Sequence, residues 1–389
     1  MTDRLAYTGA RIFDGELWWD RSMLIVADGR IEGIAAADSP LSVTRVALAG
    51  GMIVPGLIDL QVNGGGGALL NLTPDEATVA TICATALRFG TTGCLPTFIT
   101  DTREKTQAVI EAGAAAAKHG VPGFLGLHLE GPHLSIARKG AHDPALIRPM
   151  DDADLTMLIA ARPRLPHLLT TVAVENVTPA QIAKLVAAGI VVSIGHSDAS
   201  YAAVKAAAEA GATVVTHLFN AQSQLGNREP GVVGAALELG QLSAGLIADG
   251  IHVHPASIGT ALRAKHGPGH VFLVTDAMSP TGTSIQQFEL TGRTVYRKDG
   301  ALRLADGTLA GADLTLPDAI RVLTTQVGTP LEEALRMASL YPAEVLSAGA
   351  ERGRLVKGAR ADFALLTPGL EAVATYLGGE RVWSAGTAA

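Results

Sequence analysis

The chain has 389 residues, of which 48% are hydrophobic, and its formal net charge is −7. This content is sufficient for a large core and argues against intrinsic disorder. The net negative charge and the absence of a basic block argue against nucleic acid or an anionic membrane as a partner. The two cysteines, Cys83 and Cys94, make no disulfide framework. Because the sequence also contains no signal peptide and no long apolar segment, we expect a cytoplasmic protein without a membrane span.

The two ends of the chain have similar sequence patterns, which are typical of short strands joined by turns. Residues 1–50 read as short strands with turns at Asp28–Gly29 and at 49–51, and residues 350–389 read likewise. We expect the two ends to pair into one small β unit beside the rest of the chain.

Strand-like and helix-like runs alternate through the middle of the chain. Repeated strand–helix units predict a parallel sheet with right-handed crossovers. Eight such units, with polar residues where the strands end, favour a TIM (β/α)8 barrel. The alternative is a doubly wound open sheet, which normally carries a G-x-G-x-x-G turn after its first strand; the glycines at 64–67 lack that context. The expected strands are 53–62, 92–99, 123–131, 168–175, 190–196, 213–219, 243–249 and 271–276.

Capping signals mark several of the intervening helices. Thr73 is a suitable N-cap, Pro74 suits the first helical position, and Glu76 would complete a capping box. Gly90 could close that helix. The same pattern recurs at Thr178–Pro179–Gln181 and at Thr329–Pro330–Glu332.

Four strings place an imidazole or a carboxylate where an apolar run ends. HLEGPH, IGHSD, THLFNA and VTDA supply Glu130, His196, His217 and Asp276. Because the ends of barrel strands converge on one mouth, these residues should lie together. Glu130, His196 and His217 are plausible ligands of a divalent metal with one open position for water. Asp276 would remain as the carboxylate that moves the proton.

Strings along nearly the whole chain resemble those of N-acetylglucosamine-6-phosphate deacetylases, which belong to the amidohydrolase superfamily. They occur in the family's order: VPGLIDLQVNGGGG, HLEGPH with KGAHDP, IGHSDA, THLFNA with REPG, ADGIHVHP, LVTDAM and LAGADLTL. The resemblance implies a (β/α)8 catalytic domain over 53–349 and a small β-sandwich domain built from 1–52 and 350–389. It also implies a homodimer.

The activity implied is metal-dependent hydrolysis of N-acetyl-D-glucosamine 6-phosphate to D-glucosamine 6-phosphate and acetate, a step of amino-sugar metabolism. One alternative is the same reaction on the galactosamine epimer, because sequence spacing does not resolve the orientation of one hydroxyl. Another is a different amidohydrolase, such as a ring opener or a deaminase, which KGAHDP and REPG argue against. A non-catalytic scaffold is disfavoured, because the candidate metal ligands and the candidate base are all present.

The first expected strand bears on the number of metals. Many amidohydrolases have a His-x-His pair there, whereas this chain has Gln61 and Asn63. Amides are poor zinc ligands beside imidazole or carboxylate, and the fourth strand ends in AVEN without a bridging lysine. We therefore expect one tightly bound divalent metal, zinc in first place, although Fe2+, Mn2+ and Co2+ tolerate the same ligands. Gln61 and Asn63 could orient water or a weak second ion.

The resemblance assigns the remaining roles. Asp276 would take a proton from water and return it to the leaving amine. His142 is the candidate for polarising the amide carbonyl, since a developing oxyanion needs a positioned donor. His252 would contact substrate, and Arg228 would bind the phosphate, reaching the partner subunit's site. The other substrate-binding residues implied are Asn220, Ala221, Leu309, Ala310 and Gly311.

Overall fold

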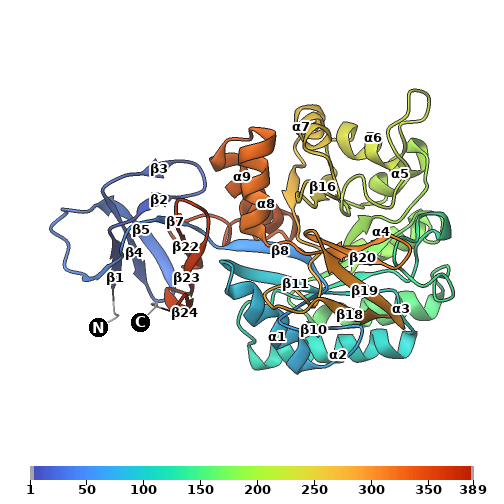
Figure 1. The fold of residues 1–389 in the computed structure, drawn as a ribbon, viewed down its shortest axis with the longest axis horizontal. Helices are drawn as coiled ribbons and strands as arrows, with labels where there is room; N and C mark the ends of the chain where they lie inside the picture. Colours follow the sequence, from blue (N-terminus) through green and yellow to red (C-terminus); the bar gives the residue numbers. More distant parts are fainter. Residues whose placement is uncertain (1–3, 387–389) are drawn as a thin grey trace.

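Eight parallel strands form the central sheet of the computed structural model, which describes residues 4–386 (Figure 1). Their order in the sheet follows their order in the chain, and helices separate consecutive strands, so the predicted barrel is confirmed over the doubly wound alternative. The strands are β8 (Leu57–Val62), β11 (Thr91–Ile99), β12 (Leu127–Glu130), β13 (Leu168–Val172), β14 (Val191–Ile194), β15 (Val214–Val215), β16 (Ser243–Leu246) and β17 (Val271–Leu273).

The barrel closes through the segment that follows β17. Val62 forms a parallel bridge with Ala277, and the Asp276 N–H donates to the Gln61 carbonyl at 2.9 Å. The Thr275 hydroxyl donates to the Asp59 carboxylate at 2.5 Å. Closure therefore brings the last strand-end carboxylate beside the amide side chains of the first strand.

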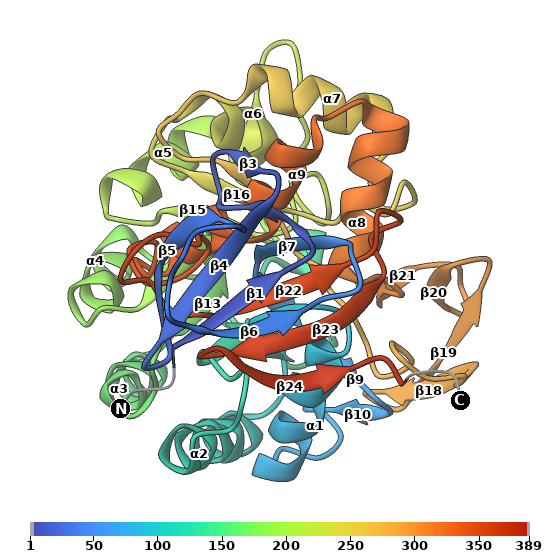
Figure 2. The same ribbon diagram turned by 90° about the vertical axis from the view of Figure 1, so that its left-hand side faces the viewer.

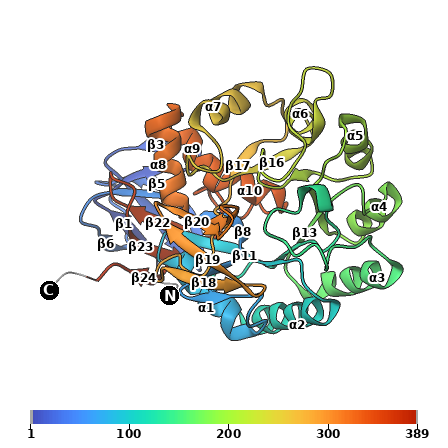
Figure 3. The ribbon, with the colours of Figure 1, turned by 45° about the vertical axis from the view of Figure 1, so that its right-hand side comes forward.

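Helices surround the barrel on its outer side (Figure 3). They bury apolar side chains such as Val79, Val109, Ile182 and Val204 against the strands. In residues 4–386, no helix is both long and apolar enough to cross a membrane. The α-helices are α1 (Glu76–Leu87), α2 (Arg103–His119), α3 (Asp152–Ala161), α4 (Pro179–Ala187), α5 (Tyr201–Glu209), α6 (Gly231–Glu238), α7 (Pro255–Ala264), α8 (Leu316–Val322), α9 (Leu331–Ala338) and α10 (Leu340–Val345). Shorter turns of helix are η1 (Ile136–Arg138), η2 (Arg162–Arg164) and η3 (Leu323–Val327).

The capping signals predicted one helix start of three correctly. The box at Thr178 and Gln181 caps α4 as expected. The prediction for α1 is wrong by two residues, because the Asp75 side chain accepts from the Thr78 N–H and so starts the helix later. At α9 the N-cap is Pro330, with no side-chain capping bond.

Both ends of the chain contribute strands to one β-sandwich (Figure 2). In the six-stranded sheet, β22 from the C-terminal end lies antiparallel to β7 from the N-terminal end. Phe363 and Tyr376 stack on each other, and Tyr7 packs edge to face against both, with ring centroids 4.3 to 5.2 Å apart. This pairing confirms the predicted second domain; its boundaries stay a prediction, and its outermost residues, 1–3 and 387–389, lie outside the described range. The sheets are β24-β23-β22-β7-β2-β3 and β5-β4-β1-β6, with β1 (Leu5–Thr8), β2 (Arg11–Phe13), β3 (Trp18–Trp19), β4 (Ser22–Ala27), β5 (Arg30–Ala36), β6 (Thr44–Ala47), β7 (Met52–Pro55), β22 (Phe363–Leu366), β23 (Ala372–Leu377) and β24 (Glu380–Ser384).

The single strand expected over 53–62 is in fact two strands. β7 belongs to the sandwich and β8 to the barrel, and Gly56 lies between them. A Cβ atom at Gly56 would lie 2.0 Å from the Thr92 hydroxyl oxygen, so only glycine lets the chain pass from one domain to the other here.

A four-stranded antiparallel sheet, here called the accessory sheet, follows β17 and was not predicted. Its first two hairpins turn at Thr291–Gly292 and Asp299–Gly300, whose φ angles are all positive. Leu290, Val295 and Leu302 form its own small core. Its strands are β18 (Gln287–Leu290), β19 (Arg293–Lys298), β20 (Ala301–Leu304) and β21 (Leu309–Ala312); a separate short hairpin consists of β9 (Gly64–Gly65) and β10 (Ala68–Leu69).

Candidate active site

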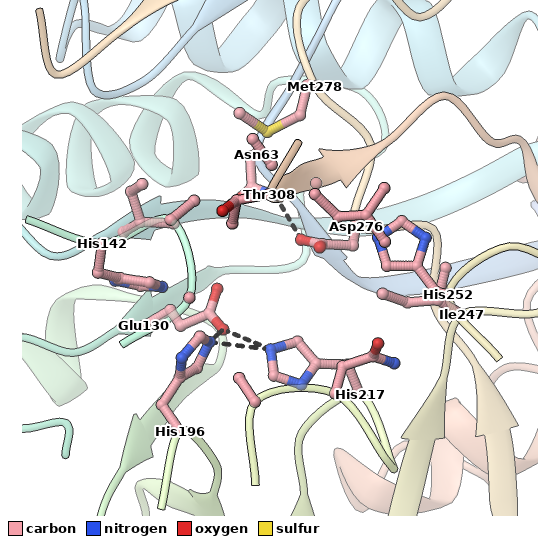
Figure 4. A pocket seen from close by; sticks show the side chains of 18 of the residues that line it. Asn63, Glu130, His142, His196, His217, Ile247, His252, Asp276, Met278 and Thr308 are labelled. Carbon is pink, nitrogen blue, oxygen red and sulfur yellow. Dashed lines mark hydrogen bonds and ion pairs between the residues drawn. The ribbon is translucent and has the colours of Figure 1, made fainter. Parts of the chain in front are cut away.

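A cavity of about 490 Å3 lies where the barrel strands end, with residues of the accessory sheet on one side of it. Most of the residues predicted for the site line this cavity (Figure 4). Those brought together are Asn63, Glu130, His142, His196, His217, Asn220, Ala221, His252, Asp276, Leu309, Ala310 and Gly311.

The backbone is strained at three of the residues whose side chains reach the cavity. His196, His217 and Asp276 have φ angles of 47°, 28° and 51°, in a region that residues with a Cβ rarely occupy. Each stands two or three residues beyond the end of its strand, where the chain turns away from the barrel axis. Strain of this kind concentrates at functional sites, because the surrounding fold must hold it in place.

Glu130, His196 and His217 present three atoms to one point. Glu130 Oε1 lies 3.1 Å from His196 Nε2 and 3.0 Å from His217 Nε2, and the two nitrogens are 3.1 Å apart. Tetrahedral zinc, with bonds of roughly 2.0–2.1 Å, separates its ligand atoms by about 3.3 Å, close to this triangle. The His196 Nδ1–H donates to the Arg138 carbonyl at 2.8 Å, which leaves the Nε2 lone pair for a metal. The residues therefore fit a divalent cation.

Histidine 142 offers a second, overlapping set of ligands. Potential ligand atoms of Glu130, His142 and His196 all lie within 4.8 Å of one another. The contacts of His217 are shorter, at 3.0 to 3.1 Å, so the set with His217 is the better candidate. His142 Nδ1 is also engaged by the Thr100 hydroxyl at 2.8 Å. Burial holds the pKa of His142 well below its usual value, so this imidazole is neutral.

Asp276 faces the metal-ligand candidates across the cavity (Figure 4). Its Oδ1 accepts from Asn63 Nδ2 at 2.6 Å and from Gln61 Nε2 at 3.2 Å. The same Gln61 nitrogen donates to Glu130 Oε2 at 3.1 Å. Burial, reinforced by the charge of Glu130, raises the pKa of Asp276 to about 6. The two amides thus hold one oxygen of Asp276, and among residues 4–386 no hydrogen bond reaches the other.

His252 lies beside Asp276, and a hydrogen bond to Asp249 orients its ring. Its Nδ1 is 2.6 Å from Asp249 Oδ2, so the ring donates there and turns Nε2 toward the cavity. The opposite wall depends on a glycine: a Cβ at Gly140 would approach His196 Cε1 to 3.2 Å. Because Gly140 also has φ +55°, the loop that carries His142 can pass this close to His196 only with glycine there.

Two predicted site residues lie elsewhere. Gln61 is buried beneath the cavity, with contacts to Glu130 and Asp276, and does not line it. Arg228 is exposed in the loop between β15 and α6 and does not line the cavity of its own chain.

The structure adds residues that the sequence did not single out. Met278, Thr308, Arg138 and Arg303 line the cavity, and Thr100 contacts His142 from below. Thr100 directly follows the last residue of β11, so the rule that used polar residues at strand ends could have identified it. Arg303 lies in the unpredicted accessory sheet, although the Asp299–Gly300 turn is a recognised hairpin signal.

Comparisons with known proteins bear on the family and the fold. The Amidohydrolase family profile matches residues 52–386. The chain is 40% identical over 384 residues to an N-acetylgalactosamine-6-phosphate deacetylase of Shewanella sp. (strain ANA-3), covering 97% of this chain and 95% of that protein. It is 34% identical over 365 residues to the N-acetylglucosamine-6-phosphate deacetylase of Haemophilus influenzae, covering 92% and 94%. The crystal structure of N-acetylglucosamine-6-phosphate deacetylase from Pasteurella multocida superimposes with a TM-score of 0.93 at 34% identity, covering 97% of this chain and 99% of that one.

Proposed function

The chain belongs to the amidohydrolase family, and we propose that within it the chain hydrolyses N-acetyl-D-glucosamine 6-phosphate to D-glucosamine 6-phosphate and acetate. The observation that carries the proposal is the convergence of Glu130, His196 and His217 opposite Asp276 in one cavity. This arrangement supplies a cation site and a carboxylate base, which are the parts that amide hydrolysis needs.

We propose one divalent metal per chain, zinc in first place, held by Glu130, His196 and His217. When bound, the metal supplies positive charge that acidifies water and stabilises developing negative charge. Gln61 and Asn63 argue against a second tightly bound ion, because an amide oxygen is a poorer zinc ligand than an imidazole or a carboxylate. Their amide N–H groups are donated to Glu130 and Asp276.

Asp276 is the proposed proton carrier. Its Oδ2 accepts a proton from the attacking water as the new C–O bond forms, and the carboxyl then donates that proton to the amide nitrogen as the C–N bond breaks. The water oxygen stays with the acetyl carbon, the nitrogen leaves as the amine of the sugar, and the second water proton is released as the carboxylic acid ionises to acetate. The amides of Gln61 and Asn63 fix the other oxygen, so that the proton-accepting oxygen is held in one place.

His142 is the proposed donor to the amide carbonyl oxygen. A neutral imidazole carries one N–H, and its position depends on the partner of the other nitrogen. If the Thr100 hydroxyl donates to Nδ1 at 2.8 Å, then Nε2–H faces the cavity. A donor fixed in this way stabilises an oxyanion better than one that must reorganise.

The rest of the cavity is proposed to hold the sugar and its phosphate. His252, Leu309, Ala310 and Gly311 would contact the sugar. We propose a homodimer in which Arg228 binds the phosphate in the site of the second copy, since Arg228 is exposed and lies away from its own cavity. Asn220 and Ala221 would supply further donors at the cavity wall.

The galactosamine epimer is the second candidate substrate. The 40% identity to the Shewanella protein named for that epimer favours it over other amides. Because both epimers share the acetamide and the phosphate, the same residues would act on either.

We also propose a cytoplasmic location, supported by Cys83 and Cys94. Both thiols are free, and their sulfur atoms lie 3.7 Å apart in the core. Cysteines this close stay unpaired most readily in a reducing compartment.

The test is acetate release from N-acetylglucosamine 6-phosphate and from its galactosamine epimer, with metal content measured on the same purified sample. We expect turnover with about one metal per chain. Turnover of the galactosamine epimer alone would move the assignment to the second candidate, and turnover of neither epimer by metal-loaded protein would contradict both.

A further inference from the structure

We propose that Arg303 of the accessory sheet binds the 6-phosphate of the substrate within the same chain. This inference rests on the proposed function, because it concerns the phosphate of that substrate. It adds a cation that is already at the cavity of an isolated chain, whereas Arg228 would have to come from a second copy.

The position of Arg303 is set by the hairpin of β20 and β21. Arg303 pairs with Leu309 across this hairpin, and both residues line the cavity. The neighbouring residues Leu302 and Leu304 are buried in the core of the accessory sheet, while Arg303 is exposed. Alternation along the strand therefore turns the guanidinium away from that core. Gly307 and Thr308, in the turn of the same hairpin, also line the cavity.

The guanidinium of Arg303 is largely uncommitted. Its one hydrogen bond runs from Nη1 to the Gly307 carbonyl at 3.1 Å, and no carboxylate of residues 4–386 forms an ion pair with it. By contrast, Arg138, the other arginine of the cavity wall, is paired with Asp198 at 2.7 Å. Arg297, on strand β19 of the same sheet, donates two hydrogen bonds to the Asp313 carboxylate, with lengths of 2.6 and 2.9 Å. Arg303 thus keeps several N–H donors and an unneutralised charge for a ligand.

The charges around the hairpin suit a dianion. The carboxylate in the same turn is Asp306, which is exposed and accepts from the Thr308 N–H at 2.9 Å. Hydrogen bonds from Thr308, with Lys139 and Arg293 nearby, lower the pKa of Asp306 below its usual value. Two further cations, Lys139 and Arg293, therefore stand close to this turn, and its one carboxylate forms no ion pair with Arg303. An arginine in such surroundings matches the fork of oxygens on a phosphate.

The test compares Arg303→Ala and Arg303→Lys with the wild type, using N-acetylglucosamine 6-phosphate and unphosphorylated N-acetylglucosamine. Lys298→Ala is the matched control, because Lys298 is an exposed cation of the same sheet that does not line the cavity. For Arg303→Ala we expect KM for the phosphorylated sugar to rise on the order of 10- to 100-fold, the range that a charge-assisted hydrogen bond supports. Arg303→Lys should lie between, and kcat/KM for the unphosphorylated sugar should stay within about twofold.

Inhibition by inorganic phosphate provides a second measurement, which should weaken about tenfold or more in Arg303→Ala and stay unchanged in Lys298→Ala. Equal losses on both sugars, or equal losses in the two alanine variants, would overturn the assignment. If the wild type releases acetate and Arg303→Ala behaves like it, only the role of Arg303 fails. If the wild type does not act on either phosphorylated epimer, the proposed function itself fails.

Discussion

The floor of the cavity and its rim are built in different ways. The floor comprises Glu130, His196, His217 and Asp276, with Gln61 directly beneath them. These side chains stand at barrel strand ends, are buried or nearly so, and are joined to one another by hydrogen bonds. The rim, which comprises Arg138 and Arg303 and, in the proposed dimer, Arg228 of the second copy, consists of exposed or half-exposed cations outside the barrel strands. We infer from this difference that the rigid floor fixes the reacting atoms and that the adaptable rim selects the charged end of the substrate.

The strongest test of this division removes one imidazole at a time, either His217 of the floor or His142 of the loop beside it. We expect His217→Ala to lose the metal, with content falling from about one per chain toward zero and activity falling to background. His142→Ala should keep the metal while kcat falls on the order of 100- to 1,000-fold, the usual loss for an oxyanion donor. Metal analysis of both purified variants would decide between the two overlapping ligand sets. Metal loss in His142→Ala with retention in His217→Ala would reverse the assignment.

The next effect concerns the base. Asp276→Asn keeps the shape of the side chain but cannot accept a proton, so kcat should fall on the order of 100- to 10,000-fold. Metal content should stay at the wild-type level, because Asp276 is not among the proposed ligands. Steady-state kinetics with metal analysis would check both points, and near-normal turnover would remove Asp276 from its role.

At the rim the losses should be smaller and should fall on KM. Arg228→Ala is expected to raise KM for the phosphorylated sugar on the order of 10- to 100-fold, with little change for the unphosphorylated one. Mixing this variant with Asp276→Asn provides a sharper test. In a mixed dimer, one site would combine an intact Asp276 with an intact Arg228 from its partner, so tight binding should return. Failure of the mixture to recover it would place Arg228 outside the neighbouring site.

Thr100, which follows β11, is expected to make a smaller contribution through His142. Thr100→Val removes the hydroxyl that contacts His142 Nδ1 while keeping the shape, which would free the imidazole to change tautomer. We expect kcat to fall about tenfold with KM and metal content nearly unchanged, since one net hydrogen bond is worth on the order of 1 kcal/mol. Thr100→Ser should restore turnover, because it returns the hydroxyl; equal losses in both variants would indicate packing instead.

This contrast also explains what could be predicted from the sequence. Glu130, His196, His217 and Asp276 follow apolar runs, and the rule that parallel strands end at one mouth places them together. The order of the eight strands followed from the same periodic pattern. The left-handed backbone of His196, His217 and Asp276 had no signal in the sequence, since it depends on the surrounding packing.

The rim was less predictable because its position depends on contacts distant in the chain. Arg303 reaches the cavity only because two tight hairpins fold back over the barrel, and the signal at Asp299–Gly300 was present but unused. The passage of the chain from the sandwich to the barrel at Gly56 could not be predicted, because a continuous apolar run has the same pattern whether it forms one strand or two strands of different sheets. Similarly, Asp75 competed with Thr73 for the first cap of α1, and local sequence alone did not separate them.

The smallest predicted effect lies just below the floor, at Asp59. This carboxylate is 3% exposed and accepts from the Thr275 hydroxyl at 2.5 Å and from the Gln61 N–H at 3.1 Å. Burial, only partly offset by these bonds, raises its pKa from 3.8 to about 7. Between these two values the folded protein holds a proton that the unfolded chain releases.

The contribution of Asp59 to stability is therefore present at low pH and is lost as the pH rises through about 7. Between pH 8 and pH 6 it should add on the order of 1 kcal/mol to the free energy of unfolding, and Asp59→Asn should lack this increment. Urea denaturation of both proteins at pH 6, 7 and 8 measures the difference, from which groups common to the two cancel. Parallel pH profiles would mean that Asp59 stays ionised in the fold. The hydrogen bonds that Gln61 and Thr275 donate to Asp59 would then have to be strong enough to stabilise a buried carboxylate. The surroundings of Asp59 would in that case be more polar than its burial indicates.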